Sequence, residues 1–115
     1  MKYVNLDYLH ELSGNDTDFE KVMMEQFVQQ TPEELQALEN AIGSNDLLSA
    51  KKVAHSLKST VSYMGLAPEL HPPLESIEKA AVSGNAVNVQ ADFNHIKTVT
   101  SEAVKEIVIL LKEAQ

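Results

Sequence analysis

The apolar residues of this chain recur at helical spacing along almost its whole length. The clearest example is the segment 46–65, where they follow i, i+3, i+4 and i+7 spacing. This stripe consists of Leu47, Ala50, Val53, Ala54, Leu57, Val61 and Met64. Asp46 is placed to cap the first turn, and Gly65 to end the helix as a left-handed residue. The segment is therefore predicted to form one amphipathic helix.

Two further stripes precede this segment. Asn5 can cap a short helix that Gly14 ends, and Asp16 or Thr17 can cap a longer helix that extends to residue 43. Their apolar faces consist of Leu6, Leu9 and Leu12, and of Phe19, Val22, Met23, Phe27, Leu35, Leu38, Ala41 and Ile42. The run Thr-Pro-Glu-Glu at 31–34 has the pattern of a capping box with proline at the first helical position. The longer helix is therefore predicted either to restart or to kink there.

Prolines interrupt the pattern that follows Gly65. Pro68 suits the first turn of a helix, but Pro72 and Pro73 each remove a backbone hydrogen bond if they lie inside one. We therefore expect a short turn at 68–71, then a kink, and then a helix over 73–83. The apolar face of that helix consists of Leu74, Ile77 and Ala81.

The last stripe begins after Gly84, where Asn85 is placed to cap a helix from 86 to about 113. No segment shows the period-2 alternation that is typical of a strand. Substantial amphipathic helices joined by short turns predict an all-α fold, an antiparallel four-helix bundle. Its helices are 17–43, 46–64, 73–83 and 86–113, and the short N-terminal helix is expected to cover one end of the bundle as a lid.

Length and composition narrow the function further. A chain of 115 residues without a repeat or an interdomain linker is predicted to be a single domain, 1–115. Its formal charge of −8 argues against binding to nucleic acid or to an anionic membrane surface. It has no cysteine, no apolar run long enough to span a bilayer and no signal-peptide pattern. These features favour a cytoplasmic protein.

His55 is the candidate reactive residue, because it falls outside the apolar stripe of its helix and should face solvent. No acidic residue lies between Asp46 and Glu69, whereas Lys51, Lys52 and Lys58 all do. A positive field of this kind, on an acidic protein, favours a transient anion such as a phosphoryl group. The alternative is a surface histidine without function beside lysines that only aid solubility.

The same outer face carries candidates for a docking surface. Leu48 lies two turns before His55, where nothing in the domain should bury it, and Ser59 and Ser62 follow one and two turns later. An exposed leucine beside a histidine and lysines suggests the centre of a contact patch, and the small serines leave the imidazole accessible to another protein. Leu48, Lys51, Lys52, Ser59 and Ser62 are therefore the predicted docking residues.

Phosphoryl transfer fits this face. Neutral imidazole is a competent nucleophile, and free imidazole is mostly neutral near pH 7 because its pKa is about 6.5. Lys58, about one turn from His55, can stabilise the charge on the phosphoryl oxygens. The chain has no glycine-rich phosphate loop or other nucleotide-binding signature. It is therefore expected to carry a phosphoryl group rather than to take one from ATP by itself.

The run 54–59, Ala-His-Ser-Leu-Lys-Ser, followed by Gly65 ten residues after the histidine, resembles the signature of histidine-containing phosphotransfer (HPt) domains. The resemblance extends over most of the chain: the run 5–9 looks like the opening helix of the family, and Phe27 with Pro32 resembles its second segment. Leu74-Glu75 or Ile77-Glu78 resembles the hydrophobic–acidic pair that follows the signature.

The resemblance implies a four-helix bundle that relays phosphate between aspartates of receiver domains. It implies phosphorylation of His55 at Nε2, a role for Lys58 in binding the phosphoryl oxygens, and Mg²⁺ held by the receiver, with no cofactor of the chain's own. The expected partners are receiver domains and a hybrid sensor histidine kinase, and the chain is expected to be a monomer. The chain departs from the family pattern at Ser59, which replaces the usual glycine, and at Pro72-Pro73, inside a helix that the family makes continuous.

Two other functions stay open at this stage. One is the phospho-accepting domain of a histidine kinase of the chemotaxis type, and the other is a helical adaptor that binds receivers without chemistry. A metal site is not expected, because His10, His71 and His95 lack metal-binding spacing and Asp92-x-x-His95 is only half of a di-metal motif. The acidic clusters Glu33-Glu34 and Glu75-Glu78 are interpreted as solvated faces.

Overall fold

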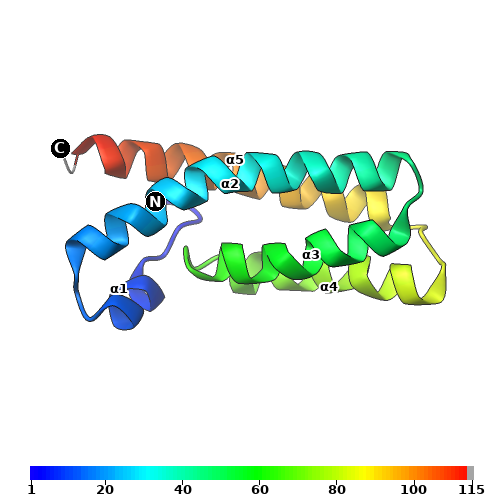
Figure 1. Cartoon of the computed structure of the whole chain (residues 1–115), viewed down its shortest axis with the longest axis horizontal. Helices are drawn as coiled ribbons and strands as arrows, with labels where there is room; N and C mark the ends of the chain where they lie inside the picture. Colours follow the sequence, from blue (N-terminus) through cyan, green and yellow to red (C-terminus); the bar gives the residue numbers. More distant parts are fainter. Residues whose placement is uncertain (114–115) are drawn as a thin grey trace.

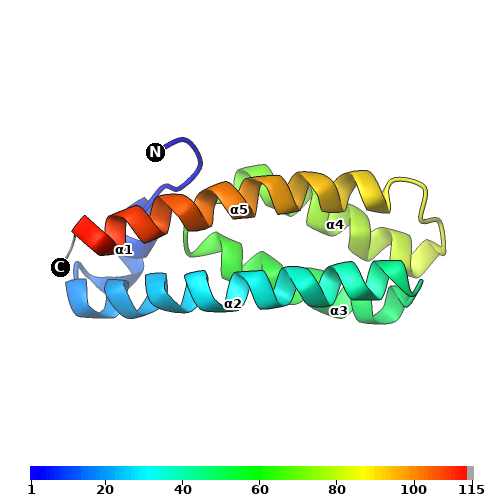
Figure 2. The ribbon, with the colours of Figure 1, turned by 90° about the horizontal axis from the view of Figure 1, so that it is seen from above.

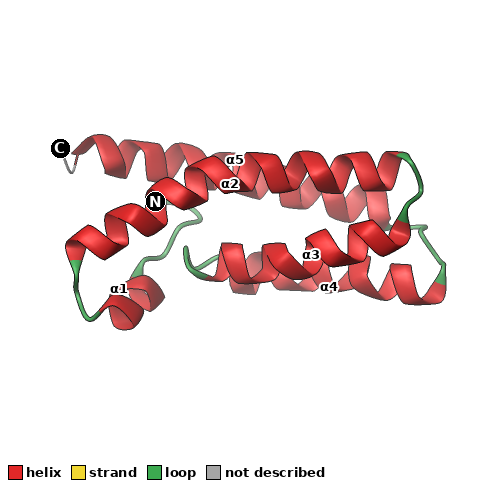
Figure 3. Cartoon of the chain, in the orientation of Figure 1, coloured by secondary structure: helices red, strands yellow, loops and turns green. Residues whose placement is uncertain are grey.

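Four long helices run antiparallel to one another in the computed structural model, which describes residues 1–113 (Figure 1). The helices are α1 (Asp7–Ser13), α2 (Thr17–Gly43), α3 (Leu47–Ser62), α4 (Ala67–Ser83) and α5 (Val89–Glu113). Seen from above, α2 and α5 lie side by side over much of their length, and α1 lies at one end (Figure 2). The described part of the chain contains no strand (Figure 3). The predicted all-α four-helix bundle with an additional N-terminal helix is therefore confirmed.

The core lies between the four long helices and is built mostly from the predicted apolar stripes, although Leu12, Phe19 and Val22, which the pattern placed on these stripes, are exposed. In α3 the buried residues are Ala50, Ala54, Leu57 and Val61, and Met64 continues the same face beyond the helix. Leu38, Leu74, Ile96 and Ile107 from the other helices are also fully buried. Burial of such side chains stabilises the fold by about 1.5–3 kcal/mol each. Within residues 1–113, no helix is both long enough and apolar enough to cross a membrane.

Aspartate side chains cap the N-termini of α2 and of α3, the helix that contains His55. Asp16 accepts hydrogen bonds from the backbone N–H groups of Asp18 and Phe19, so it, rather than Thr17, is the cap of α2. Asp46 accepts from the Ser49 hydroxyl at 2.7 Å and from the Ser49 N–H at 3.1 Å. These two hydrogen bonds lower the pKa of Asp46. The predicted start of the histidine helix is therefore confirmed.

Helix α2 does not restart at Thr31. The helix is continuous through Pro32, and Thr31 is fully buried within it instead of capping a new helix. The kink is the alternative that holds, because the axis of α2 changes direction between its blue and its cyan part (Figure 1), and a proline inside a helix is a common cause of such a bend. Phe27 and Leu38 are buried on either side of the proline, and their burial favours one helix despite the lost hydrogen bond.

The predicted break at Pro72 and Pro73 is wrong. Helix α4 begins at Ala67 and continues through both prolines to Ser83, so no separate turn forms at 68–71. Leu70 and Leu74, which lie on either side of the prolines at i, i+4 spacing, are both fully buried. Burial of this continuous stripe outweighs the loss of two backbone hydrogen bonds.

The last helix begins at Val89, three residues later than predicted. Asn85 does not cap it, because its side-chain oxygen accepts the Val87 N–H within the preceding loop. Asn5 similarly accepts the Asp7 N–H, while the residue at the cap of α1 is Leu6. Local side-chain hydrogen bonds of this kind compete with a helix start and shift it by a few residues.

The N-terminal residues 3–5 form a strap between α5 and the turn that follows α3. The Glu106 carboxylate accepts the backbone N–H groups of Tyr3 at 3.2 Å and Val4 at 3.0 Å. The Asn5 N–H donates to the Met64 carbonyl at 3.0 Å. Gly65 has φ +77°, and a Cβ there would lie 2.3 Å from the Asn5 carbonyl oxygen. Gly65 is left-handed as predicted, but it follows the end of α3 by three residues and serves the close approach of the strap.

Candidate functional site

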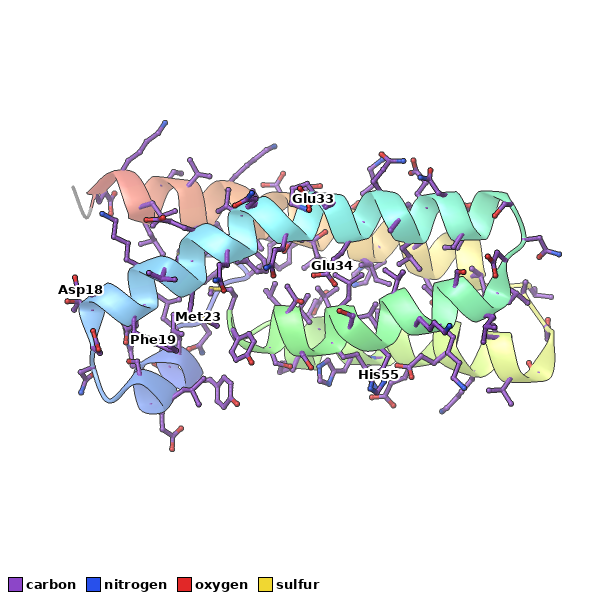
Figure 4. All side chains as sticks on the ribbon, in the orientation of Figure 1. Asp18, Phe19, Met23, Glu33, Glu34 and His55 are labelled. Carbon is purple, nitrogen blue, oxygen red and sulfur yellow. The ribbon has the colours of Figure 1, made fainter. Side chains whose placement is uncertain are left out.

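His55 lies on the face of α3 that points away from the core (Figure 4). Its neighbour Ala54 and, two residues on, Leu57 are fully buried, so the helix period turns His55 outward. The His55 side chain is 74% exposed. A partner protein can therefore reach the imidazole without any rearrangement of the bundle.

Glu78, from the antiparallel helix α4, is the closest acidic group to His55. Its Oε2 lies 3.4 Å from Nδ1 of His55, and its Oε1 lies 3.0 Å from Nζ of Lys58. The Glu78 side chain is only 17% exposed, and the preceding residue, Ile77, is buried in the core. The interpretation of Glu75-Glu78 as a solvated face is therefore wrong for Glu78.

The charge of Glu78 is maintained by these two neighbours. Burial by itself would raise the pKa of the carboxyl group, but hydrogen bonds from Lys58 and His55, together with their charges, hold the pKa below its ordinary value. The carboxylate is therefore ionised at neutral pH and acts as an acceptor only.

The contact with Glu78 assigns the tautomer of His55. Because a carboxylate cannot donate, the neutral imidazole carries its hydrogen on Nδ1, facing Glu78, and Nε2 then has the lone pair. In this arrangement Nε2 is the nucleophilic nitrogen. Lys58, which is 24% exposed, pairs with the other oxygen of the same carboxylate.

The sequence did not single out Glu78 as a partner of His55, since the two residues are 23 positions apart. The available signal was the Ile77-Glu78 pair, which resembles the hydrophobic–acidic pair of the HPt pattern. Antiparallel packing of α4 on α3 converts that pair into one buried anchor and one carboxylate at the histidine.

Four of the predicted docking residues are exposed. Leu48 is 63% exposed and is a large apolar side chain in contact with solvent. Lys51 and Lys52 follow in the next turn of α3, and Ser59 lies one turn beyond His55. These side chains surround the histidine along α3.

Ser62 differs from the other predicted docking residues because it is half-buried. Its hydroxyl donates to the Lys58 carbonyl at 2.6 Å. Nε2 of His71, from α4, lies 3.0 Å from both the Ser62 hydroxyl and the Lys58 carbonyl. Ser62 therefore lies at the edge of the exposed face, where α4 covers it.

A second carboxylate borders α3 on the opposite side. Glu34 of α2 accepts hydrogen bonds from the Ser56 hydroxyl at 3.1 Å and from the Thr60 hydroxyl at 3.0 Å. Figure 4 places Glu34 between α2 and α3, whereas Glu33 lies on the far side of α2. The prediction of a solvated face is therefore wrong for Glu34 as well, and the hydrogen bonds fix α3 against α2.

The other histidines each have a partner of their own. His10 pairs through Nδ1 with Glu20 at 2.8 Å, and His95 pairs through Nε2 with Glu69 at 3.1 Å. Residues 1–113 hold no group of three or more histidine and acidic side chains that could bind a metal ion. His55 is thus distinguished by its exposure and by the adjacent lysine rather than by its carboxylate.

Comparison with known proteins gives the family. A family model described as "Hpt domain" matches residues 22–113. The solved structure of histidine-containing phosphotransfer protein B (HptB) from Pseudomonas aeruginosa PAO1 has a TM-score of 0.86, with 21% identity and coverage of 96% of each chain. No curated protein matches the chain. The bundle is therefore the HPt fold, and the chain belongs to the Hpt domain family, whose function is histidine phosphotransfer in a phosphorelay.

Proposed function

We propose that His55 is the phosphorylated residue and that the chain is a relay intermediate between receiver domains. Nε2 of His55 accepts a phosphoryl group from a receiver aspartate and donates it to an aspartate of a second receiver. The observation that carries the proposal is the exposed imidazole whose Nδ1 faces Glu78 while Lys58 shares the same carboxylate.

In the first transfer, the lone pair on Nε2 attacks the phosphorus of the aspartyl phosphate. An N–P bond forms, the P–O bond to the aspartate breaks, and the electron pair leaves with the carboxylate. The imidazole gains a positive charge and keeps its proton on Nδ1, where Glu78 accepts it in a hydrogen bond. The reverse of these steps, with an aspartate of the second receiver as the nucleophile, transfers the phosphoryl group from Nε2 to that aspartate.

Lys58 supplies charge to the transferring group. Its ammonium group pairs with Glu78 at 3.0 Å in the free protein. A phosphoryl group on Nε2 presents oxygens that compete for this ammonium, and phosphoryl transfer is accelerated mainly by positioning and by charge stabilisation of this kind. Glu78 keeps its contact with Nδ1 when Lys58 turns to the phosphoryl oxygens.

Receiver domains and kinases are the partners of HPt domains in phosphorelays. For this chain, the receiver docks over His55 on the surface of Leu48, Lys51, Lys52 and Ser59, with Ser62 at its edge. The lysines complement the aspartates of a receiver, whose carboxylates hold the Mg²⁺ ion. A hybrid sensor kinase as donor, a monomeric state and a cytoplasmic location stay predictions of the sequence.

The transfer is tested with a purified receiver domain charged by acetyl phosphate that contains radioactive phosphorus. Label is expected on the chain, in a form that acid hydrolyses and alkali does not. His55→Gln should abolish the labelling. His10→Gln is the matched control, because His10 also pairs with a glutamate through Nδ1 but lies on α1. Labelling of the His55 variant at the wild-type rate would refute the proposal.

The two other functions give different outcomes in the same experiment. A phospho-accepting domain of a chemotaxis-type kinase would be labelled only when an ATP-binding catalytic domain and ATP are added. An adaptor would bind receivers with the same affinity whether or not His55 is replaced, and it would never take up label.

A further inference from the structure

An open cavity of about 460 Å³ lies at the end of the His55 face, where α1, the strap and the start of α4 meet. Its walls include Tyr8 of α1, Ser62 at the end of α3, and Ala67 and Pro68 at the start of α4. The Tyr8 side belongs to the exposed surface, since Tyr8 is 47% exposed. Neither His55 nor Lys58 lines this cavity.

We propose that this cavity holds an apolar side chain of the receiver domain that docks on His55. The inference rests on the proposed function, and it adds a second anchoring point to the docking surface. The predicted docking residues lie along α3, whereas the walls of the cavity come mainly from α1, the strap and α4.

The position of the cavity favours this occupant. Ser62 follows His55 by seven residues, which turns it by only about 20° from the direction of His55 and moves it about 10 Å along α3. A standard interface covers about 800 Å² per partner, a patch roughly 30 Å across. A receiver centred on His55 therefore covers the mouth of the cavity, so that any side chain entering it comes from the same partner.

The walls are fixed before a partner arrives. The rings of Tyr8 and Tyr63 stack with their centroids 6.4 Å apart, which ties α1 to the end of α3. The strap is held to the same turn by the hydrogen bond from Asn5 to Met64 and by its contact with Gly65. A preformed cavity costs little ordering on binding, and residues that dominate binding energy are typically apolar or aromatic anchors in such pockets.

The size and chemistry of the cavity also agree with an apolar side chain. A volume of 460 Å³ accommodates a leucine or an aromatic ring. Apolar atoms of Tyr8, Ala67 and Pro68 form much of the wall. Asp7 lies at the cavity as well, so an acidic side chain of the partner is disfavoured.

The test fills the cavity. Ala67→Phe places a ring at the first residue of α4, and Ala91→Phe is the matched control, because Ala91 is exposed in the first turn of α5 and lines none of the cavities at the His55 face. The probe is the receiver that labels the wild-type chain fastest among a panel of purified receivers. Ala67→Phe is expected to raise its Kd at least tenfold, and Ala91→Phe to change it less than twofold. Equal Kd values for the two variants would overturn the proposal.

A small donor separates this proposal from the proposed function. Phosphoramidate labels a reactive histidine without docking, so the ratio of receiver-dependent to phosphoramidate-dependent labelling should fall at least tenfold in Ala67→Phe. A wild-type chain that neither donor labels would refute the proposed function, whereas a wild-type ratio in Ala67→Phe would refute only the role of the cavity.

A second variant and a second measurement address folding and self-association. Tyr8→Ser removes one wall instead of filling the space, and it is expected to weaken receiver binding in the same direction. Thermal unfolding of each variant shows whether the bundle is intact. If sedimentation showed wild-type dimers that Ala67→Phe dissociates, the occupant would be a second copy of the chain, and the proposal would be wrong.

Discussion

Two histidine–glutamate pairs in this molecule use the same ring nitrogen and yet serve different ends. His10 and Glu20 join α1 to α2 at 2.8 Å, whereas His55 and Glu78 face each other across α3 and α4 at 3.4 Å. The His10 side chain is 46% exposed and that of His55 is 74% exposed. A histidine beside a glutamate is thus not by itself evidence of a reactive site.

The difference lies in what else the carboxylate binds. Glu20 also accepts the Ser13 hydroxyl at 2.5 Å, so it is committed to contacts within the α1–α2 turn. Glu78 shares its second oxygen with Lys58, a cation that can move to an incoming anion. Glu78 thus lies between an exposed histidine and a lysine, an arrangement that suits the proposed transfer, whereas Glu20 accepts two short hydrogen bonds that hold the fold.

Replacement of Lys58 is the strongest test of the difference between the two histidine–glutamate pairs. Lys58→Ala should slow transfer from a receiver about 100-fold, which corresponds to about 2.7 kcal/mol in the transition state. The midpoint of thermal unfolding should fall as well, because the Lys58 and Glu78 side chains are only 24% and 17% exposed and the variant leaves Glu78 without the ammonium group. Rapid-quench measurement of labelling checks the rate. A variant that transfers as fast as the wild type would remove the distinction between the two pairs.

Replacement of each glutamate should separate the two roles. Glu78→Ala is expected to slow labelling by phosphoramidate about tenfold, because the tautomer of His55 is no longer selected. Glu20→Ala should leave this rate unchanged and lower the free energy of unfolding by about 1.5–3 kcal/mol, through loss of hydrogen bonds to a charged group. Urea unfolding gives the second quantity. The comparison would be contradicted if Glu20→Ala slowed labelling while Glu78→Ala left the labelling rate unchanged.

Leu48, the exposed apolar residue two turns before His55, should affect only the docking of the receiver. Leu48→Asp is expected to raise the Kd for the receiver about tenfold, about 1.4 kcal/mol. Ile109→Asp is the control, since Ile109 is 55% exposed on α5. Calorimetric titration measures both. The docking assignment fails if the two variants bind equally well.

The His10–Glu20 pair should contribute to the response of the fold to acid. Hydrogen bonds from Ser13 and His10 lower the pKa of Glu20 below the ordinary value of 4.5. A carboxyl group with a lowered folded-state pKa contributes stability above its unfolded pKa and loses it as the pH falls through the folded pKa. Thermal unfolding is measured between pH 6 and pH 3, a range of about three pH units around the ordinary pKa of a glutamate. Glu20→Gln should lose less stability over this range than the wild type. Identical slopes would show that Glu20 is not responsible.

Much of this arrangement could be predicted from local pattern. The stripe of α3 and the Asp46 cap place His55 on the outer face, because the helix period alone decides which side a residue takes. The element boundaries at prolines could not be predicted in this way. Pro72 and Pro73 lie inside α4 because burial of Leu70 and Leu74 against the rest of the bundle outweighs a local cost, and that burial is a tertiary effect.

The site shows the same limit. Glu78 and His71 reach α3 from α4, so their contacts with His55 and Ser62 depend on how the two helices are registered. Helix periodicity gives the direction of a side chain but not the residue opposite to it. The docking surface was therefore predicted along one helix, whereas its partners on the neighbouring helix were not.

The strap has a consequence for the order in which this molecule folds. Its contacts with Glu106 join residues more than 100 positions apart, whereas the helix pairs form from neighbouring segments. Contacts between residues far apart in the sequence carry a large loop-closure entropy cost and are expected to form late in folding. Segments held by few such contacts open first. Amide hydrogen exchange should therefore be faster at Val4 and Asn5 than in α3. Asn5 of the strap also lines the cavity at the end of the His55 face, so this wall is formed in the folded protein but is expected to be less protected from exchange than α3.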